Sequence, residues 1–132
     1  MCPLTDWTQI AKVEQLAESH TLAEKTGLGT NNLHKFVEQM FSGPYTPYSN
    51  RLLAGDYMRD DPLFQIDLAL KDCRHMLHLA ESTGTVMGNL QVVMQHLEAV
   101  KAERGEKGDF AAVYGAVRKE SGLPFDNRDG SA

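Results

Sequence analysis

Apolar residues recur every three or four positions along most of this chain, which is the spacing of one face of an α-helix. The clearest short example is the set Leu33, Phe36, Val37, Met40 and Phe41. A longer stripe runs through Leu63, Ile66, Leu70, Cys73, Leu77 and Ala80. No segment alternates apolar and polar residues for long enough to indicate a strand. The pattern therefore predicts an all-α protein.

Capping residues, glycines and prolines divide this pattern into six predicted helices. The first begins at Thr5 or Asp6 and ends at Gly27, and the second begins at Thr30 or Asn31 and stops at residues 42–44. The others are expected at 48–54, at 62–83, at 87–104, and after a cap at Asp109. At 1.5 Å per residue the helix 62–83 would be roughly 33 Å long, so we expect it to be the central one. We expect a helical domain at 1–125 and a frayed polar tail at 126–132.

Size, charge and cysteine content narrow the classes of function. With 132 residues and 42% hydrophobic content, the chain is long enough for one domain with a core. A net charge of −5 argues against nucleic acid as a partner, because binding to phosphates needs a basic surface. Two cysteines do not indicate a disulfide framework, and no stretch approaches the length of a membrane span. We expect a cytoplasmic protein without a membrane partner.

One segment, from Phe64 to Asp72, carries the most informative chemistry. Phe64 and Lys71 are seven residues apart, about two helical turns, so an aromatic ring and a cation would follow one another beside the buried stripe. A lysine in this place could meet an anion, or it could pair with Asp67 one turn earlier on a solvated surface. His75 and His78 have a spacing that two metal ligands can use, but a solvated face is the favoured interpretation and we predict no metal site.

Several short motifs follow one another in a fixed order along most of the chain. They are Leu16-Ala-Glu, Leu22-Ala-Glu-Lys-Thr-Gly27, the segment from Phe64 to Lys71-Asp72, Ala80-Glu-Ser-Thr-Gly84, and Gly108-Asp109-Phe-Ala-Ala-Val-Tyr114. In order and spacing, residues 7–125 resemble the C-terminal helical domain of the β-hydroxyacid dehydrogenases. These are relatives of 6-phosphogluconate dehydrogenase and include 3-hydroxyisobutyrate and tartronate semialdehyde reductases. The resemblance implies a six-helix domain of the 6-phosphogluconate dehydrogenase type.

The resemblance also implies a site. In the family, a Rossmann domain binds NAD or NADP, and the helical domain closes a cleft in which a hydride passes to or from a small hydroxyacid. By its motif, Lys71 matches the lysine that reaches the cofactor from the helical domain, and Phe64 matches the aromatic residue that lines its side of the cleft. The family's catalytic lysine falls at Cys2 and its substrate-orienting asparagine falls at Asp6. Lys12 is ten residues beyond Cys2, about 15 Å along a helix, which is too far for a substitute.

Two functional hypotheses follow, because no strand with a Gly-x-Gly-x-x-Gly motif precedes the first predicted helix. The chain is either the cofactor-contacting and substrate-cleft domain of an NAD(P)-dependent oxidoreductase, or a non-catalytic dimerisation or interaction module derived from that family. In both cases we name no catalytic residue and expect no turnover by the chain alone. The expected partners are a second copy, through the helical faces, or a separate Rossmann-domain chain. Lys71→Gln separates the hypotheses, since only the first needs the ammonium group.

Overall fold

The computed structural model describes residues 3–129. Within that range it contains six α-helices and no β-strand, which confirms the all-α prediction. The helices are α1 (Pro3–Lys25), α2 (Thr30–Met40), α3 (Tyr45–Leu53), α4 (Ile66–Thr83), α5 (Gly88–Arg104) and α6 (Val113–Glu120). No described helix is both long enough and apolar enough to cross a membrane.

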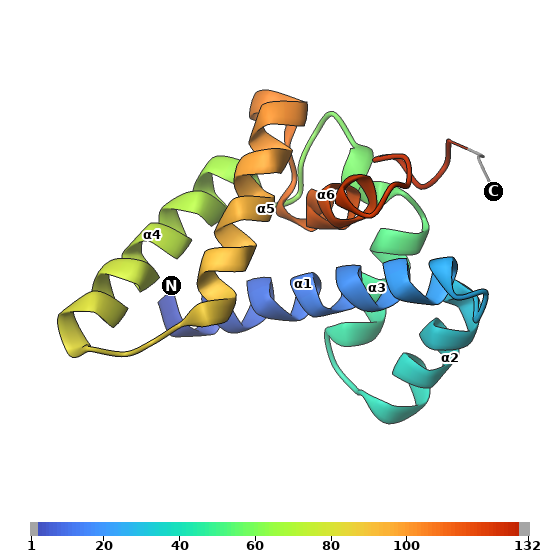
Figure 1. The fold of residues 1–132 in the computed structure, drawn as a ribbon, viewed down its shortest axis with the longest axis horizontal. Helices are drawn as coiled ribbons and strands as arrows, with labels where there is room; N and C mark the ends of the chain where they lie inside the picture. The colour runs from blue at the N-terminus through green and yellow to red at the C-terminus, as the bar shows by residue number, and fades with distance from the viewer. Residues whose placement is uncertain (1–2, 130–132) are drawn as a thin grey trace.

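The central helix is α1, which is the longest at 23 residues and contacts each of the other five. In Figure 1, α4 and α5 pair beside its N-terminal part, while α2 and α3 lie toward its C-terminal end. One face of this helix is buried against the other helices. Its apolar and aromatic members are Ile10, Val13, Leu16, Ala17, His20 and Ala23.

The predicted central helix at 62–83 was misplaced. Helix α4 begins only at Ile66 and is 18 residues long. The four residues before it are not helical, because the chain there pairs with a distant segment: Ile66 N–H donates to Gly108 O at 2.8 Å, and Phe110 N–H donates to Phe64 O at 2.9 Å. Leu63 therefore leaves the buried stripe and is 58% exposed, whereas Ile66, Leu70, Cys73 and Ala80 are buried as predicted.

Glycine at position 108 leaves room for this pairing. A Cβ atom there would lie 3.1 Å from Ile66 Cγ2, which is closer than ordinary van der Waals contact, so the Ile66 side chain would have to shift. The next residue, Asp109, has the predicted capping role, since its Oδ1 accepts a hydrogen bond from Ala111 N–H at 2.9 Å. The Gly108-Asp109 motif thus joins the start of α4 to the start of the last helix.

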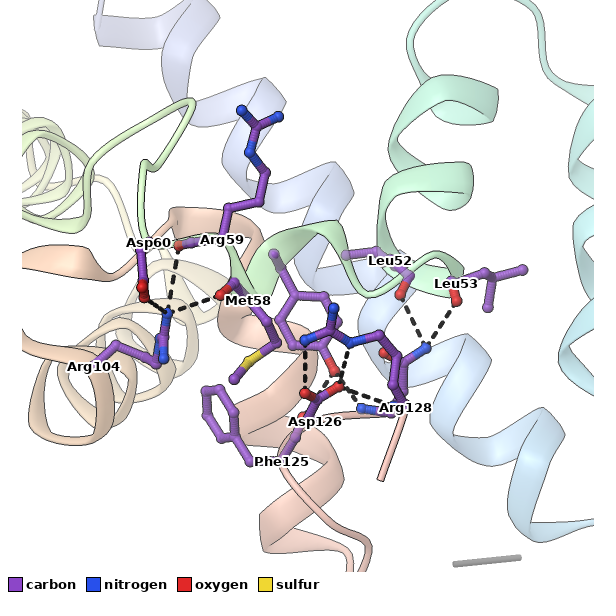
Figure 2. Close-up of polar contacts among 11 residues, drawn as sticks. Leu52, Leu53, Met58, Arg59, Asp60, Arg104, Phe125, Asp126 and Arg128 are labelled. Carbon is purple, nitrogen blue, oxygen red and sulfur yellow. Dashed lines mark hydrogen bonds and ion pairs between the residues drawn. The ribbon is translucent and has the colours of Figure 1, made fainter. Parts of the chain in front are cut away.

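Within the tail expected to fray from residue 126 onward, residue 127 is instead bonded to the end of α3, through the carbonyl oxygens of Leu52 and Leu53 (Figure 2). Asn127 Nδ2 donates to the carbonyl oxygens of Leu53 at 2.9 Å and Leu52 at 3.2 Å. The Tyr57 hydroxyl donates to Phe125 O at 2.8 Å and accepts from Asn127 N–H at 2.9 Å. The last carbonyls of a helix have no partner within it, so a nearby amide side chain satisfies them.

Helix α2 has the predicted amphipathic pattern but not the expected burial. Val37 is its one buried residue, whereas Phe36 is 51% and Met40 is 63% exposed. Phe41, the residue after the helix, is 41% exposed. An apolar face therefore remains at the surface of the chain beside the C-terminal end of α1.

Candidate cofactor site

Phe64 lies directly before Gln65, the N-cap residue of α4, and is held by other aromatic rings. Its ring meets Phe110 edge to face, with centroids 5.0 Å apart, and Phe110 meets Tyr48 in the same way at 5.7 Å. Such pairs add stability beyond the apolar area they bury. Phe110 thus fixes the half-buried ring of Phe64, and Tyr48 in turn supports Phe110.

The buried carboxylate of Asp109 lies next to this aromatic cluster, against the backbone of Phe64. Its Oδ2 accepts the backbone N–H of Leu63 at 2.8 Å and that of Phe64 at 3.4 Å. The same oxygen forms an ion pair with Arg51 Nη2 at 3.0 Å. Asp109 therefore positions the backbone of Phe64 directly. The sequence had marked Asp109 as a helix cap, but no local pattern indicated Arg51 as its partner, because the two are far apart in the chain.

Lys71 lies in the second turn of α4 with an exposed side chain. Within residues 3–129 it forms no hydrogen bond or ion pair. The alternative pairing with Asp67 does not occur, since Asp67 pairs with Lys101 of α5 instead. Leu68, one turn before Lys71 on the same outer face, is 50% exposed. The structure thus presents an unpaired ammonium group next to an exposed apolar side chain.

The other candidate groups on α4 are two histidines and a cysteine. His75 and His78 are exposed, and no three metal-ligating side chains come together in the described part of the chain. Cys73 is buried, and this burial raises the pKa of its thiol to about 11, so the thiolate is scarce at neutral pH.

Lys12 of α1 has an environment that the sequence did not indicate. Its amine lies over the ring of Tyr48, 4.3 Å from the centroid, and hydrogen-bonds Gln9 Oε1. It is buried, and no carboxylate among residues 3–129 pairs with it. Burial lowers the pKa of this amine. Through Tyr48, Lys12 touches the same aromatic cluster that holds Phe64. Of the two positions that match the family's catalytic pair, Asp6 lies in the first turn of α1 and Cys2 lies outside the described residues.

The two residues named from the sequence differ in character. Lys71 presents an ammonium group that has no carboxylate partner among residues 3–129, and Phe64 and Leu68 present apolar surface at the start of α4.

Comparison with known proteins decides the family. Residues 9–117 match the family described as the NAD-binding domain of NADP-dependent 3-hydroxyisobutyrate dehydrogenase. This chain belongs to that family. It is also 36% identical over 117 residues to the NADH-dependent oxidoreductase ucdB of Aspergillus ustus. The aligned region is 88% of this chain but 41% of the relative, so the chain spans less than half of that protein's length.

Membership in the 3-hydroxyisobutyrate dehydrogenase family confirms the resemblance seen in the motifs. It also confirms the predicted cofactor class, NAD or NADP, because NAD binding is the defining property in the family's description. Phe64, Lys71 and the Gly108-Asp109 motif all fall inside the matched range. The chain is therefore an NAD-binding domain of a dehydrogenase-like oxidoreductase.

Proposed function

We propose that this chain supplies the helical side of the cofactor site and substrate cleft in an NAD(P)-dependent oxidoreductase of the β-hydroxyacid dehydrogenase type. Lys71 contacts the bound dinucleotide through its ammonium group, and Phe64 forms an apolar wall of the cleft. The observation that carries this proposal is the unpaired, exposed state of Lys71 inside the family's matched range.

The neighbouring cations support this choice, because they are already paired with carboxylates. Lys101 pairs with Asp67, and Arg74 pairs with Glu98 at 3.4 Å. Lys71, in contrast, has no carboxylate partner among residues 3–129.

The expected contribution of Lys71 is modest. An exposed charge pair is worth about 1 kcal/mol, which corresponds to roughly a fivefold change in Kd. Lys71→Gln should therefore weaken binding of NADH or NADPH by about three- to tenfold. Lys35→Gln is the matched control: Lys35 is an exposed lysine on α2, away from α4.

The bound cofactor would supply or accept the hydride, and the residues of this chain bind and orient it. The position that matches the family's catalytic lysine is Cys2, and Lys12 is enclosed by Tyr48 and Gln9. We therefore propose that the chain does not catalyse hydride transfer alone. Sustained, enzyme-dependent NADH oxidation by the purified chain with a small aldehyde acid would contradict this part of the proposal.

A second function, assembly, is favoured by the exposed apolar face of α2. Phe36, Met40 and Phe41 present rings and a thioether to solvent, which is the kind of surface that another protein covers. The partner in this case is a second copy of the chain. Sedimentation equilibrium should give a dimer that Met40→Gln weakens and Lys71→Gln leaves unchanged; a monomer at all concentrations would refute the assembly function.

A further inference from the structure

Three helices meet at one buried hydroxyl group, that of Ser49 on α3. Its Oγ lies 2.8 Å from His20 Nε2 of α1 and 2.7 Å from His34 Nδ1 of α2. His20 and Ser49 are fully buried, and the His34 side chain is only 13% exposed. This junction lies where α2 and α3 pack toward the C-terminal end of α1 (Figure 1), apart from the exposed face that carries Lys71.

The Ser49 hydroxyl has a single hydrogen, so it donates to one of the two rings and must accept from the other. His34 Nε2 lies 3.4 Å from Glu38 Oε1, and a carboxylate only accepts, so the ring proton of neutral His34 belongs on Nε2. His34 Nδ1 then accepts from Ser49, and Ser49 accepts from the Nε2–H of His20. This direction leaves His20 Nδ1 without a proton, and that atom has no hydrogen-bond partner within residues 3–129.

Protonation of His34 reverses this chain of hydrogen bonds. Both ring nitrogens of an imidazolium donate, so Ser49 must accept from His34 and donate to His20. His20 Nε2 then becomes an acceptor, and the single ring proton of His20 changes from Nε2 to Nδ1 by exchange with water. Burial lowers the pKa of His20 to about 4, so this ring stays neutral and the one proton taken up is on His34. The result is a buried N–H on His20 without an acceptor, which costs free energy.

We propose that these three residues form a pH switch, in which protonation of His34 reverses the hydrogen bond of Ser49 and loosens the packing of α2 on α1 and α3. Two further titratable groups face the rings. Tyr114 of α6 meets His20 edge to face at 6.3 Å, and burial raises its pKa, so it stays neutral. Glu38 is 48% exposed, so solvent screens its attraction for the His34 cation.

The direction of the switch follows from these bonds. The contact of α2 is at full strength while His34 is neutral and weakens as the pH falls, because only the neutral ring leaves His20 without a buried, unpaired N–H. Histidine gains its charge between about pH 8 and pH 5. Mild acid should therefore loosen the helix that carries the exposed apolar face.

Long-range ¹H–¹⁵N NMR correlations of the histidine rings test the switch, because they distinguish the two neutral tautomers of an imidazole. We expect His20 to carry its proton on Nε2 at about pH 8 and on Nδ1 at about pH 5.5. His34→Gln should remove this change. His78→Gln, which replaces an exposed histidine of α4, is the matched control and should keep it.

Amide hydrogen exchange measures the loosening of α2. After correction for the pH dependence of intrinsic exchange, the protection of α2 amides relative to α1 amides should fall at least about fivefold over the same pH range, the lower end for an unsatisfied buried donor. His34→Gln should abolish this fall, and His78→Gln should retain it. Circular dichroism melting verifies that each variant is folded. If His34→Gln fails to fold, the His20 tautomers and the α2 protection of the unmodified chain at the two pH values decide the test.

Three outcomes would overturn the proposal. The first is the same His20 tautomer at both pH values, which would mean that Ser49 does not couple the two rings. The second is a tautomer change that persists in His34→Gln, which would assign the change to another group. The third is equal relative protection of α2 at both pH values, which would mean that the hydrogen bond reverses without loosening the helix.

Discussion

Replacement of Asp109 by asparagine should be among the most damaging changes of one functional group in this chain. The Asp109 side chain is 1% exposed, and it accepts hydrogen bonds from Leu63 N–H and Ala111 N–H and an ion pair from Arg51. The side chain of Arg51 is itself only 17% exposed. Asp109→Asn keeps the shape of the side chain but removes its charge. It also replaces one acceptor oxygen with an NH2 group, which cannot accept the hydrogen bonds of these donors.

The magnitude follows from burial. Breaking a buried ion pair by removing one partner costs about 3 to 5 kcal/mol. Asparagine keeps one acceptor oxygen, so we expect a loss near the lower end, about 3 kcal/mol of the free energy of unfolding. For a domain of this size, each kcal/mol lowers the melting temperature by roughly 3 to 5 °C, so the expected fall is about 10 to 15 °C.

Asp56→Asn is the matched control, because Asp56 also pairs with Arg51, at 3.4 Å, but is 33% exposed. Solvent screens that pair, and its loss should cost no more than about 1 kcal/mol. Urea unfolding followed by circular dichroism at 222 nm measures both variants. Our reasoning is refuted if Asp109→Asn loses less than about 1 kcal/mol, or if Asp56→Asn loses as much as Asp109→Asn.

Three further predictions concern the rest of the fold. An NMR titration of His96, whose ring nitrogens bond Glu14 and Glu120, should give a midpoint near pH 9. The stabilisation of the fold by the charged His96 ring is complete below about pH 6.5 and should be lost as the pH rises through 9. A midpoint near pH 6.5 would contradict the pairing of His96 with Glu14. Burial lowers the pKa of Lys12, so the unfolded chain binds the Lys12 proton more tightly than the folded chain does. The free energy of unfolding should therefore rise as the pH approaches about 10.4. Urea titrations at several pH values measure this rise, and Lys12→Met should remove it. Gly115→Ala should cost about 1 to 3 kcal/mol in the same assay, because its Cβ would lie 2.6 Å from the ring of Phe125, whereas Gly88→Ala, with open space around it, should be neutral or stabilising.

Local patterns predicted most of the helices and most of the buried stripe of α4, because both depend on residues three or four apart. The start of α4 could not be predicted in this way. It depends on pairing between Phe64 and Phe110, which are 46 residues apart in the sequence, with α4 and α5 between them. The contacts of Asn127 in the tail could not be predicted for a similar reason, since its partners are carbonyl oxygens at the distant end of α3.

In the candidate site, too, some features follow from the local sequence and others depend on how the helices pack. The motif match indicated Phe64 and Lys71, and the spacing of α4 placed Lys71 outside its buried stripe. The pairing of Asp67 with Lys101, which leaves Lys71 free, depends on how α4 packs against α5 and has no signal in the sequence of α4 alone. The ion pair between Asp109 and Arg51 and the cover of Tyr48 over Lys12 likewise appear only after the helices are packed.

The central claim is that this helical domain contacts a nicotinamide dinucleotide through Lys71. Isothermal titration calorimetry of the purified chain with NADH and NADPH tests it most directly, with Lys71→Gln beside Lys35→Gln. The account predicts saturable binding of at least one nucleotide with a Kd below about 100 μM, roughly 5.5 kcal/mol, that weakens three- to tenfold in Lys71→Gln alone. No saturable heat with either nucleotide, or equal affinities of the two variants, would contradict it.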